Sequence, residues 1–388
     1  MSTDQSERAT GKDAAGTERP LIALAAGGTG GHMFPAQALA AELKSRDFRI
    51  LLITDARGER YAEEFPCDEK FLISAATPNV GGPVRKAMAA AAIAGGLIKS
   101  MSEFKQRRVA AAIGFGGYPS LPAMKAAAFM KIPYGVHEQN AVLGRSNRVL
   151  AKGADFVAHA FPNISHVPTG DINLVEVGNP VRRAVEPFAG VEFSVPAADE
   201  PFKLLIFGGS QGASVFANTI PAILKGLPTS LRERVEVVQQ ARPTEVDAVK
   251  AQYTEIDLKT EVAPFFSDLP NRIADAHLVI CRSGASTVTE LSVIGRPSIL
   301  VPLPIAMDDH QAGNATVLEA VGAAVMIREG KDFQTQLSIE LEQLFMNPGR
   351  LVQMARGAKN RVSADASRHL ADLVEQFLIS AQSKRQAA

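Results

Sequence analysis

The sequence contains no tryptophan, only two cysteines in 388 residues, and no excess of either sign of charge. Cys67 and Cys281 are far apart and lack the spacing of a metal or redox motif, which predicts a reducing compartment. Lysine plus arginine equals aspartate plus glutamate, at 41 each, so no global field attracts nucleic acid. These absences predict a cytoplasmic protein that does not bind nucleic acid.

Long apolar runs are absent as well. The longest alanine-rich run, 87–98, is far shorter than the about 20 residues that a membrane-spanning helix needs. Residues 1–19 are small and polar and contain no apolar segment of the kind found in secretory signals, which predicts a disordered tail. We therefore expect neither a secretory signal nor a transmembrane helix.

Strand-like and helix-like segments alternate along the chain, and its length predicts two domains. The alternation is typical of parallel sheets covered by helices, so we predict two α/β, doubly wound, Rossmann-like domains. We expect an N-terminal domain at 20–184, a linker at 185–200, a C-terminal domain at 201–365 and a final helix at 366–388 that packs back on the N-terminal domain. The predicted strands are 21–25, 48–54, 109–113, 132–136, 203–207, 234–239, 278–281 and 298–301.

Two glycine-rich turns directly follow apolar strands, GGTGG at 27–31 and GGSQG at 208–212. Glycine lets the backbone turn sharply and approach a ligand, and the next helix directs free N–H groups at any anion placed there. Ligands of open parallel sheets lie beyond the carboxyl ends of the strands, where both turns fall. We therefore expect one phosphate-friendly site in a cleft between the two domains.

Polar side chains follow strands in the first half of the chain. His32, at the expected start of a helix, can take a proton from a hydroxyl nucleophile, although a histidine there can also merely cap the helix. The glycine turn at 114–117 can be no more than a tight turn, with Ser120 as the cap of the next helix. The run HEQN at 137–140 gathers four polar side chains at the end of a strand, which favours a functional role.

In the second half, the run from Cys281 to Glu290 follows a strand and opens a helix. Ala285, Ser286 and Thr287 can offer backbone N–H groups to a diphosphate. Glu290, one turn inside the helix, can accept two hydrogen bonds from a ribose diol, or it can serve the first turn as a capping carboxylate.

The segment 307–314 (MDDHQAGN) follows another strand and offers both metal-ligand and sugar-binding groups. Asp308, Asp309 and His310 are of the types that bind metals. However, no third carboxylate stands nearby at ligand spacing, and a sugar-binding loop also accounts for Gln311 and Asn314. We therefore expect no metal.

Taken together, the motifs GGTGGHMFP (27–35), GFGGY (114–118), HEQN (137–140), GNPVR (178–182), GGSQG (208–212), CRSGA (281–285) with Glu290, and DHQ (309–311) closely resemble the MurG family. The resemblance runs from about 21 to about 360, with every motif in family order. It implies the two-domain GT-B glycosyltransferase fold. It also implies metal-independent, cofactor-free transfer of N-acetylglucosamine (GlcNAc) from UDP-GlcNAc to the 4-hydroxyl of the muramyl sugar of lipid I. The anomeric centre is inverted, and the product is lipid II for peptidoglycan.

The resemblance also implies roles for individual residues. His32 would be the catalytic base, and Gln311 with His310 would contact the GlcNAc hydroxyls, although family members often carry a second glutamine where His310 stands. Ser210 would lie near the phosphates, and Phe266 would lie beside uracil through its backbone. The remaining residues expected to bind UDP-GlcNAc are Thr29, Gly30, Gly31, Asn140, Arg182, Ala285, Ser286, Thr287, Val288, Thr289 and Glu290.

Because lipid I is a membrane lipid, the resemblance implies a peripheral enzyme on the cytoplasmic face of the bacterial inner membrane. Cell-division or elongation proteins would be further partners. Cations flank the apolar run near residue 90, and apolar burial plus about 1 kcal/mol per cation would bind an anionic surface reversibly. A core helix with a solvated basic end is the alternative. The predicted docking residues are Arg85, Lys86, Leu97, Ile98, Lys99, Met101 and Phe104.

Two other functions remain open from the sequence. Another GT-B sugar-nucleotide enzyme, such as a 2-epimerase, would share the architecture, because a fold does not fix a function. A nucleotide-sugar sensor without turnover is the second alternative. The presence of both His32 and Glu290 favours an enzyme over a sensor, because a sensor needs the donor pocket without a base.

Overall fold

The structure is a computed structural model that describes residues 19–386 except 74–82, 198–199, 210–211 and 360–364. The chain divides into two compact units. Unit 1 comprises Met1–Arg182 and Asp365–Ala388, and unit 2 comprises Arg183–Ala364. The C-terminal segment therefore belongs to the same unit as the N-terminal half of the chain.

Unit 1 contains a seven-stranded sheet in the order β3-β2-β1-β4-β5-β6-β7, and all its strand pairs are parallel. Because the strands are parallel, their carboxyl ends lie at one edge of the sheet, where the loops that follow them gather. The strands are β1 (Leu21–Ala25), β2 (Arg49–Thr54), β3 (Glu69–Leu72), β4 (Val109–Gly114), β5 (Tyr134–Glu138), β6 (Phe156–His159) and β7 (Leu174–Glu176).

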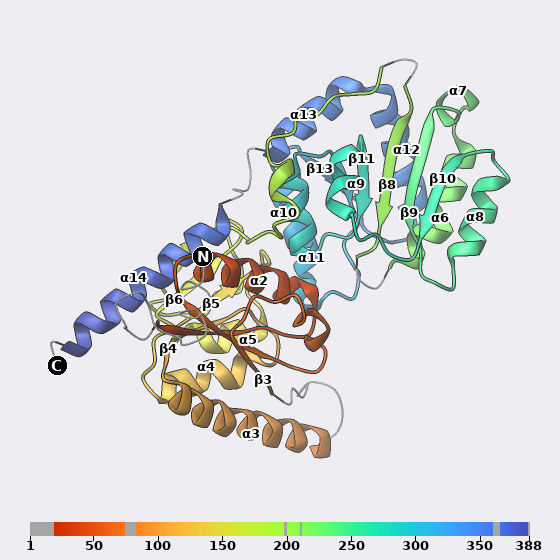
Figure 1. Cartoon of the computed structure of the whole chain (residues 1–388). Helices are drawn as coiled ribbons and strands as arrows, with labels where there is room; N and C mark the ends of the chain where they lie inside the picture. The colour runs from red at the N-terminus through yellow and green to blue at the C-terminus, as the bar shows by residue number, and fades with distance from the viewer. Residues whose placement is uncertain (1–18, 74–82, 198–199, 210–211, 360–364, 387–388) are drawn as a thin grey trace, which may run out of the picture. The chain divides into compact units, whose positions relative to one another are not determined.

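Helices cover both faces of this sheet (Figure 1). Alternate residues of β1 point to opposite faces: Ile22 and Leu24 pack with α2 and α14, whereas Leu21 and Ala23 pack with α3 and α4. The helices are α2 (Gly30–Ser45), η1 (Glu59–Tyr61), α3 (Pro83–Arg107), α4 (Ser120–Phe129), α5 (Arg145–Ala151) and α14 (Ala366–Gln386).

Unit 2 repeats the plan with a six-stranded parallel sheet in the order β10-β9-β8-β11-β12-β13. Its strands are β8 (Phe202–Phe207), β9 (Val235–Gln240), β10 (Lys259–Ala263), β11 (Leu278–Cys281), β12 (Ser298–Leu300) and β13 (Ala324–Met326). Its helices are η2 (Glu186–Phe188), α6 (Ser214–Gly226), α7 (Thr229–Arg232), α8 (Val246–Thr254), α9 (Leu269–Asp275), α10 (Ala285–Ile294), η3 (Met307–Asp309), α11 (His310–Glu319), α12 (Phe333–Met346) and α13 (Pro348–Lys359).

The segment expected to link the domains, 185–200, lies within unit 2. Val185 is fully buried, and Phe193 and Val195 pack against the core of unit 2. The chain therefore enters unit 2 directly after Arg182, and these apolar side chains attach the segment to that unit.

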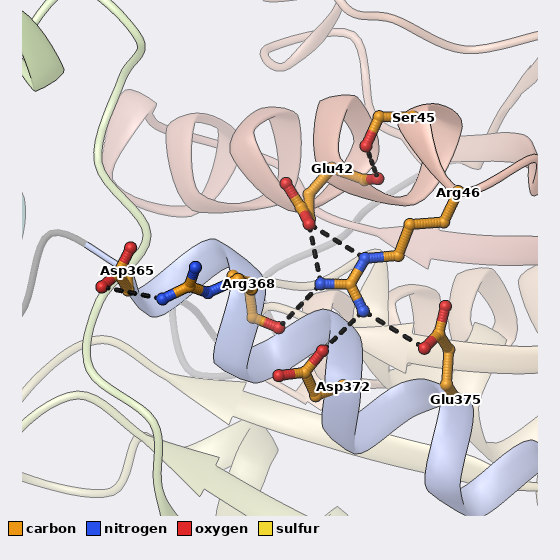
Figure 2. A network of polar contacts seen from close by, with 7 residues as sticks. All are labelled: Glu42, Ser45, Arg46, Asp365, Arg368, Asp372 and Glu375. Carbon is orange, nitrogen blue, oxygen red and sulfur yellow. Dashed lines mark hydrogen bonds and ion pairs between the residues drawn. The ribbon is translucent and has the colours of Figure 1, made fainter.

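Helix α14 is fixed to α2 by apolar and ionic contacts. Leu370 and Val374 join the core cluster that α2 lines. Arg46, which follows α2, places its guanidinium 2.6 Å from Asp372 and 3.2 Å from Glu375. The same guanidinium binds Glu42 of α2 at 2.7 Å, so one cation joins three carboxylates from two helices (Figure 2).

We expect Arg46→Met to loosen α14. The side chain of Arg46 is only 19% exposed, so its ion pairs are partly shielded from solvent. Each such pair contributes about 0.2–1 kcal/mol, so the loss of the two pairs to α14 should accelerate amide hydrogen exchange in α14 by about 2- to 30-fold.

Arg368→Met is the matched control, because among the described residues the Arg368 side chain pairs with Asp365, directly before α14, at 3.0 Å, and both side chains are more than half exposed, at 58% and 54%. Exchange measured by mass spectrometry should change little in that variant. Equal exchange in α14 for the two variants would contradict the role given to Arg46.

Candidate active site

The first glycine turn leads from β1 into α2. Gly28 has a φ of +84°, and its N–H donates to Asp55 at 3.2 Å. Thr29 is extended and exposed at the N-cap of α2, and among the described residues no side chain caps this helix. Gly30 and Gly31 therefore begin the helix with backbone N–H groups suited to an anion, as the sequence predicts.

Asp55 and Arg57 support this turn, and sequence analysis did not single out either residue. Burial alone would raise the pKa of Asp55. Arg57, at 2.8 Å, and the N–H groups of Gly58 and Gly28 together outweigh this effect, so the pKa of Asp55 lies below its usual range. The position of Asp55, directly after β2 at the carboxyl edge of the sheet, was the available signal.

The ring of His32 packs against the glycine turn at 114–117. Gly116 and Gly117 have φ values of +86° and +75°, and a Cβ added at Gly116 would lie 3.2 Å from Cε1 of the His32 ring. The prediction that Ser120 caps α4 is wrong. Its hydroxyl is buried and lies 2.7 Å from the carbonyl oxygens of Ala25 and Gly116, so it ties the turn to β1 instead.

The HEQN run is mostly an internal network. His137, Glu138 and Gln139 are buried, and only Asn140 is partly exposed. The Glu138 carboxylate accepts from the backbone N–H of Asn140 at 3.0 Å and that of Gly144 at 2.8 Å. Three of the four side chains are therefore enclosed by the protein, and only Asn140 is partly open to a ligand.

Arg182 lies near the first glycine turn through an aromatic contact. Its guanidinium lies 5.0 Å from the centre of the Phe34 ring, and a Cβ added at Gly30 would lie 2.7 Å from the same ring. Thr29, Gly30, Gly31, His32 and Arg182 thus form one group in unit 1.

In unit 2, the first turn of α10 is open to a ligand. Gly284 is its extended N-cap, and no described side chain caps the helix. The hydroxyl of Ser286 is buried and has no hydrogen-bond partner among the described residues. An uncapped N-terminus beside an unpaired hydroxyl fits the predicted diphosphate.

Two residues of α10 that are predicted to contact UDP-GlcNAc are enclosed in the protein. Val288 and Thr289 are fully buried, and the Thr289 hydroxyl donates to the Ala285 carbonyl at 2.9 Å. Both side chains pack α10 onto unit 2, so they are not available to contact UDP-GlcNAc. Glu290, a carboxylate only 4% exposed, keeps its predicted place one turn inside the helix.

The start of α11 is fastened to the start of α10. The Ser283 hydroxyl donates to the Gln311 carbonyl at 2.8 Å, and Asn314 donates to the Ser283 carbonyl at 3.1 Å. The side-chain oxygen of Gln311 accepts from the N–H of Leu303 at 3.0 Å, which leaves its amide nitrogen as a donor. His310 binds the Met307 carbonyl through Nδ1 at 2.8 Å.

The other groups around α11 and β10 have local partners. Asp309 pairs with Arg328 at 2.7 Å, and within the described part of the chain no three His, Cys, Asp or Glu side chains are grouped as metal ligands. Phe266 is buried, with the Arg272 guanidinium 4.2 Å from its ring centre. Ser210 lies outside the described residues.

Helix α3 only partly matches the predicted membrane surface. Phe104 is 1% exposed in the core of unit 1, so its assignment as a docking residue is wrong. Leu97 and Met101 are partly buried against the same core, whereas Ile98 is 69% exposed. Lys99 is exposed and donates to the Leu72 carbonyl at 2.9 Å. The side chains of Arg85 and Lys86 lie outside the described set.

Among the helices described, none is both long and apolar enough to cross a bilayer. Of the apolar residues predicted to dock on the membrane, Ile98 is the most exposed.

Family models match both halves of the chain. The N-terminal domain of glycosyltransferase family 28 matches residues 22–159, and the C-terminal domain of the same family matches residues 203–370. Together with two parallel Rossmann-like sheets, each carrying a glycine turn before a helix, these matches define the chain as a glycosyltransferase of the GT-B fold.

Two similar curated relatives bear the name UDP-N-acetylglucosamine–N-acetylmuramyl-(pentapeptide) pyrophosphoryl-undecaprenol N-acetylglucosamine transferase. The relative from Methylorubrum extorquens is 46% identical over 357 residues, 92% of this chain and 97% of the relative. The relative from Sinorhizobium medicae is 45% identical over 362 residues, 92% of this chain and 96% of the relative.

The crystal structure of Acinetobacter baumannii MurG matches with a TM-score of 0.73 and 30% identity, and covers 92% of this chain and 99% of its own. The chain belongs to the MurG family of glycosyltransferases. A UDP-GlcNAc 2-epimerase from Neisseria meningitidis also matches, with a TM-score of 0.64 but only 12% identity, over 93% of this chain and 100% of its own. That likeness shows the shared fold alone.

Proposed function

We propose that this chain transfers GlcNAc from UDP-GlcNAc to the 4-hydroxyl of the muramyl sugar of lipid I, which yields lipid II and UDP. The observation that carries the proposal is 46% identity over 92% of the chain to a transferase of that name. Similarity along the whole chain, rather than along one domain, supports the use of both the donor and the acceptor.

The reaction is an inverting displacement in which His32 acts as general base. Its imidazole takes the proton of the acceptor 4-hydroxyl as that oxygen attacks the anomeric carbon of GlcNAc. The bond from the anomeric carbon to the diphosphate oxygen breaks, and UDP departs with the electron pair. The N–H groups at the start of α10 stabilise the negative charge that develops on the diphosphate.

The donor contacts of this proposal come mainly from unit 2. Ala285, Ser286 and Thr287 bind the diphosphate, and Glu290 binds the ribose diol. Gln311 contacts the GlcNAc hydroxyls through its amide nitrogen, because its oxygen is held by Leu303. Two further residues are proposed to bind UDP-GlcNAc: Ser210, near the phosphates, and Phe266, beside uracil.

Unit 1 completes the proposed site. It supplies the base, His32, and further contacts with UDP-GlcNAc from Thr29, Gly30, Gly31, Asn140 and Arg182. The proposed reaction therefore uses donor-binding groups of unit 2 together with the base of unit 1. No metal or cofactor takes part in the proposed reaction.

The proposal is tested by transfer of radiolabelled GlcNAc from UDP-GlcNAc to a lipid I analogue in the presence of EDTA, with an acceptor-free control. Label should appear in the lipid at the same rate with and without EDTA. Transfer that EDTA abolishes and Mg²⁺ restores would contradict metal independence, and UDP release that needs no acceptor would contradict transfer itself.

We further propose that the enzyme is peripheral on the cytoplasmic face of the inner membrane, where α3 docks on anionic lipid and where division or elongation proteins are partners. Ile98→Asp should reduce flotation with vesicles of anionic phospholipid, because a charge replaces an exposed apolar side chain at the surface.

Ile379→Asp on α14 is the matched control, since Ile379 is similarly exposed, at 64%. Flotation of this control should equal that of the unmodified protein. Unchanged flotation of Ile98→Asp would place the docking surface on another element.

A further inference from the structure

A continuous line of hydrogen bonds runs from His32 into the interior of unit 1. Nδ1 of His32 lies 2.9 Å from the side-chain oxygen of Gln139. The side-chain nitrogen of Gln139 lies 3.0 Å from Nδ1 of His137, whose Nε2 lies 2.9 Å from the carbonyl oxygen of Gly178. The line therefore ends at a backbone acceptor.

That backbone acceptor fixes the protons of His137. The ring is fully buried, and burial lowers the pKa of His137 to about 4, so the imidazole is neutral at physiological pH. A carbonyl oxygen only accepts, so Nε2 of His137 must carry the proton that it donates to Gly178. Nδ1 of His137 is consequently an acceptor.

The orientation of the Gln139 amide follows from its two neighbours. One end of the amide lies 3.0 Å from Nδ1 of His137 and 2.9 Å from the His137 carbonyl oxygen. Both are acceptors, so that end must be the NH₂ group, which has two hydrogens to donate. The amide oxygen of Gln139 therefore faces His32 and can only accept.

We propose that Gln139, oriented by His137, is a positioning residue that holds neutral His32 as the Nδ1–H tautomer and so keeps the Nε2 lone pair for the acceptor hydroxyl. The proposal rests on the proposed function. Which imidazole nitrogen carries the proton is set by the hydrogen bond that the other nitrogen makes. Within the described residues, Nε2 of His32 has no recorded hydrogen bond, so the substrate hydroxyl has no competitor there.

The hydrogen bond between His32 and Gln139 can also persist while His32 takes the proton of the acceptor hydroxyl. When Nε2 of His32 takes the hydroxyl proton, Nδ1–H continues to donate to Gln139, so the ring need not turn during the reaction. The ring also lies against the glycine turn at 114–117, where a Cβ added at Gly116 would be 3.2 Å from Cε1 of His32. A positioned base of fixed tautomer is what general base catalysis requires.

The test is two-dimensional ¹H–¹⁵N NMR of full-length protein labelled with ¹⁵N-histidine, recorded without substrate at pH 8. His32 is assigned from the resonances lost in His32→Gln. We expect the His32 spectrum of an Nδ1–H imidazole in the unmodified protein and a change toward Nε2–H in Gln139→Leu. The kcat for transfer by Gln139→Leu should fall by about 10- to 100-fold, with the KM for UDP-GlcNAc little changed.

Two further variants separate positioning from a merely structural role. Gln139→Glu keeps an oxygen to accept from His32 but loses the donor to His137, so it should lower stability yet retain the Nδ1–H signature and more of the kcat than Gln139→Leu. Gln37→Leu is the matched control, because Gln37 also lies on unit 1 but donates to the Glu64 carbonyl, at 2.9 Å. It should leave both readouts unchanged.

An Nε2–H spectrum for His32 in the unmodified protein would overturn the proposal, as would an unchanged spectrum in Gln139→Leu. Failure of the proposed function would look different. It would appear as absent transfer by a protein whose His32 spectrum still shows the Nδ1–H tautomer.

Discussion

Alanine at position 32 should lower kcat for transfer by about 100- to 10,000-fold while UDP-GlcNAc binds nearly as before. The loss is expected because His32 acts on the acceptor proton, whereas the donor contacts are proposed mainly on unit 2. The half-buried imidazole packs against the glycine turn at 114–117, and among the described residues its side chain bonds only to Gln139, so its removal leaves the α2 backbone bonds in place. Radiolabel transfer gives kcat, and titration calorimetry gives the donor Kd.

His369→Ala is the control for this experiment, because His369 is an exposed histidine on α14 that is not among the residues assigned to the reaction. Its kcat should match that of the unmodified enzyme. A donor Kd that rises in step with the loss of kcat in His32→Ala would make His32 a binding or structural residue and not the base.

Replacement of Glu290 should act on donor binding. Hydrogen bonds to a charged group contribute about 1.5–3 kcal/mol each, so losing the two bonds to the ribose in Glu290→Ala should raise the Kd for UDP-GlcNAc by about 100-fold or more. Glu290→Gln retains the shape and one acceptor, so its Kd should lie between those of the unmodified enzyme and Glu290→Ala. Calorimetry with UDP and with 2′-deoxy-UDP measures the preference for the ribose hydroxyl.

The unmodified enzyme should prefer UDP, and Glu290→Ala should lose that preference. Glu319→Gln is the control, because Glu319 lies at the far end of α11 and accepts from the backbone N–H of Met326 at 3.1 Å. If Glu290→Ala keeps the preference for UDP, Glu290 is a capping or packing carboxylate and another group binds the ribose.

Most interior strands could be predicted from the sequence, whereas the edge strands and the interior strand β6 could not. Each of the eight predicted strands coincides with a strand of the structure to within two residues at either end. Central parallel strands are buried on both faces and read as continuous apolar runs. β10 lies at a sheet edge, and its polar side chains hide the pattern, whereas β7 and β13 have only three residues each.

Helix α2 begins slightly earlier than the sequence suggests. It starts at Gly30 and contains Pro35, whereas we expect the helix to start at His32. The glycine turn supplies the first turn of the helix. That earlier start places His32 within the first turn of α2, close to the expected position.

The candidate site residues that were wrongly assigned are residues that the fold buries. Leu97, Met101 and Phe104 have the i, i+4, i+7 spacing of a core-facing helix stripe, a signal that could have excluded Phe104 from the membrane surface. Ile98 lies one position off that stripe and is exposed. The HEQN run marks Gln139 only as a polar residue after a strand, because its proposed role depends on contacts with His32 and His137 that only the fold brings together.

The most direct test of the proposed reaction is the structure of the product made from UDP-GlcNAc and a lipid I analogue, determined by mass spectrometry and NMR. We predict one GlcNAc in β linkage to the 4-oxygen of the muramyl sugar, with one UDP released per product. An α linkage would contradict inversion. Conversion of UDP-GlcNAc into its 2-epimer, or recovery of the donor unchanged despite tight binding, would contradict transfer.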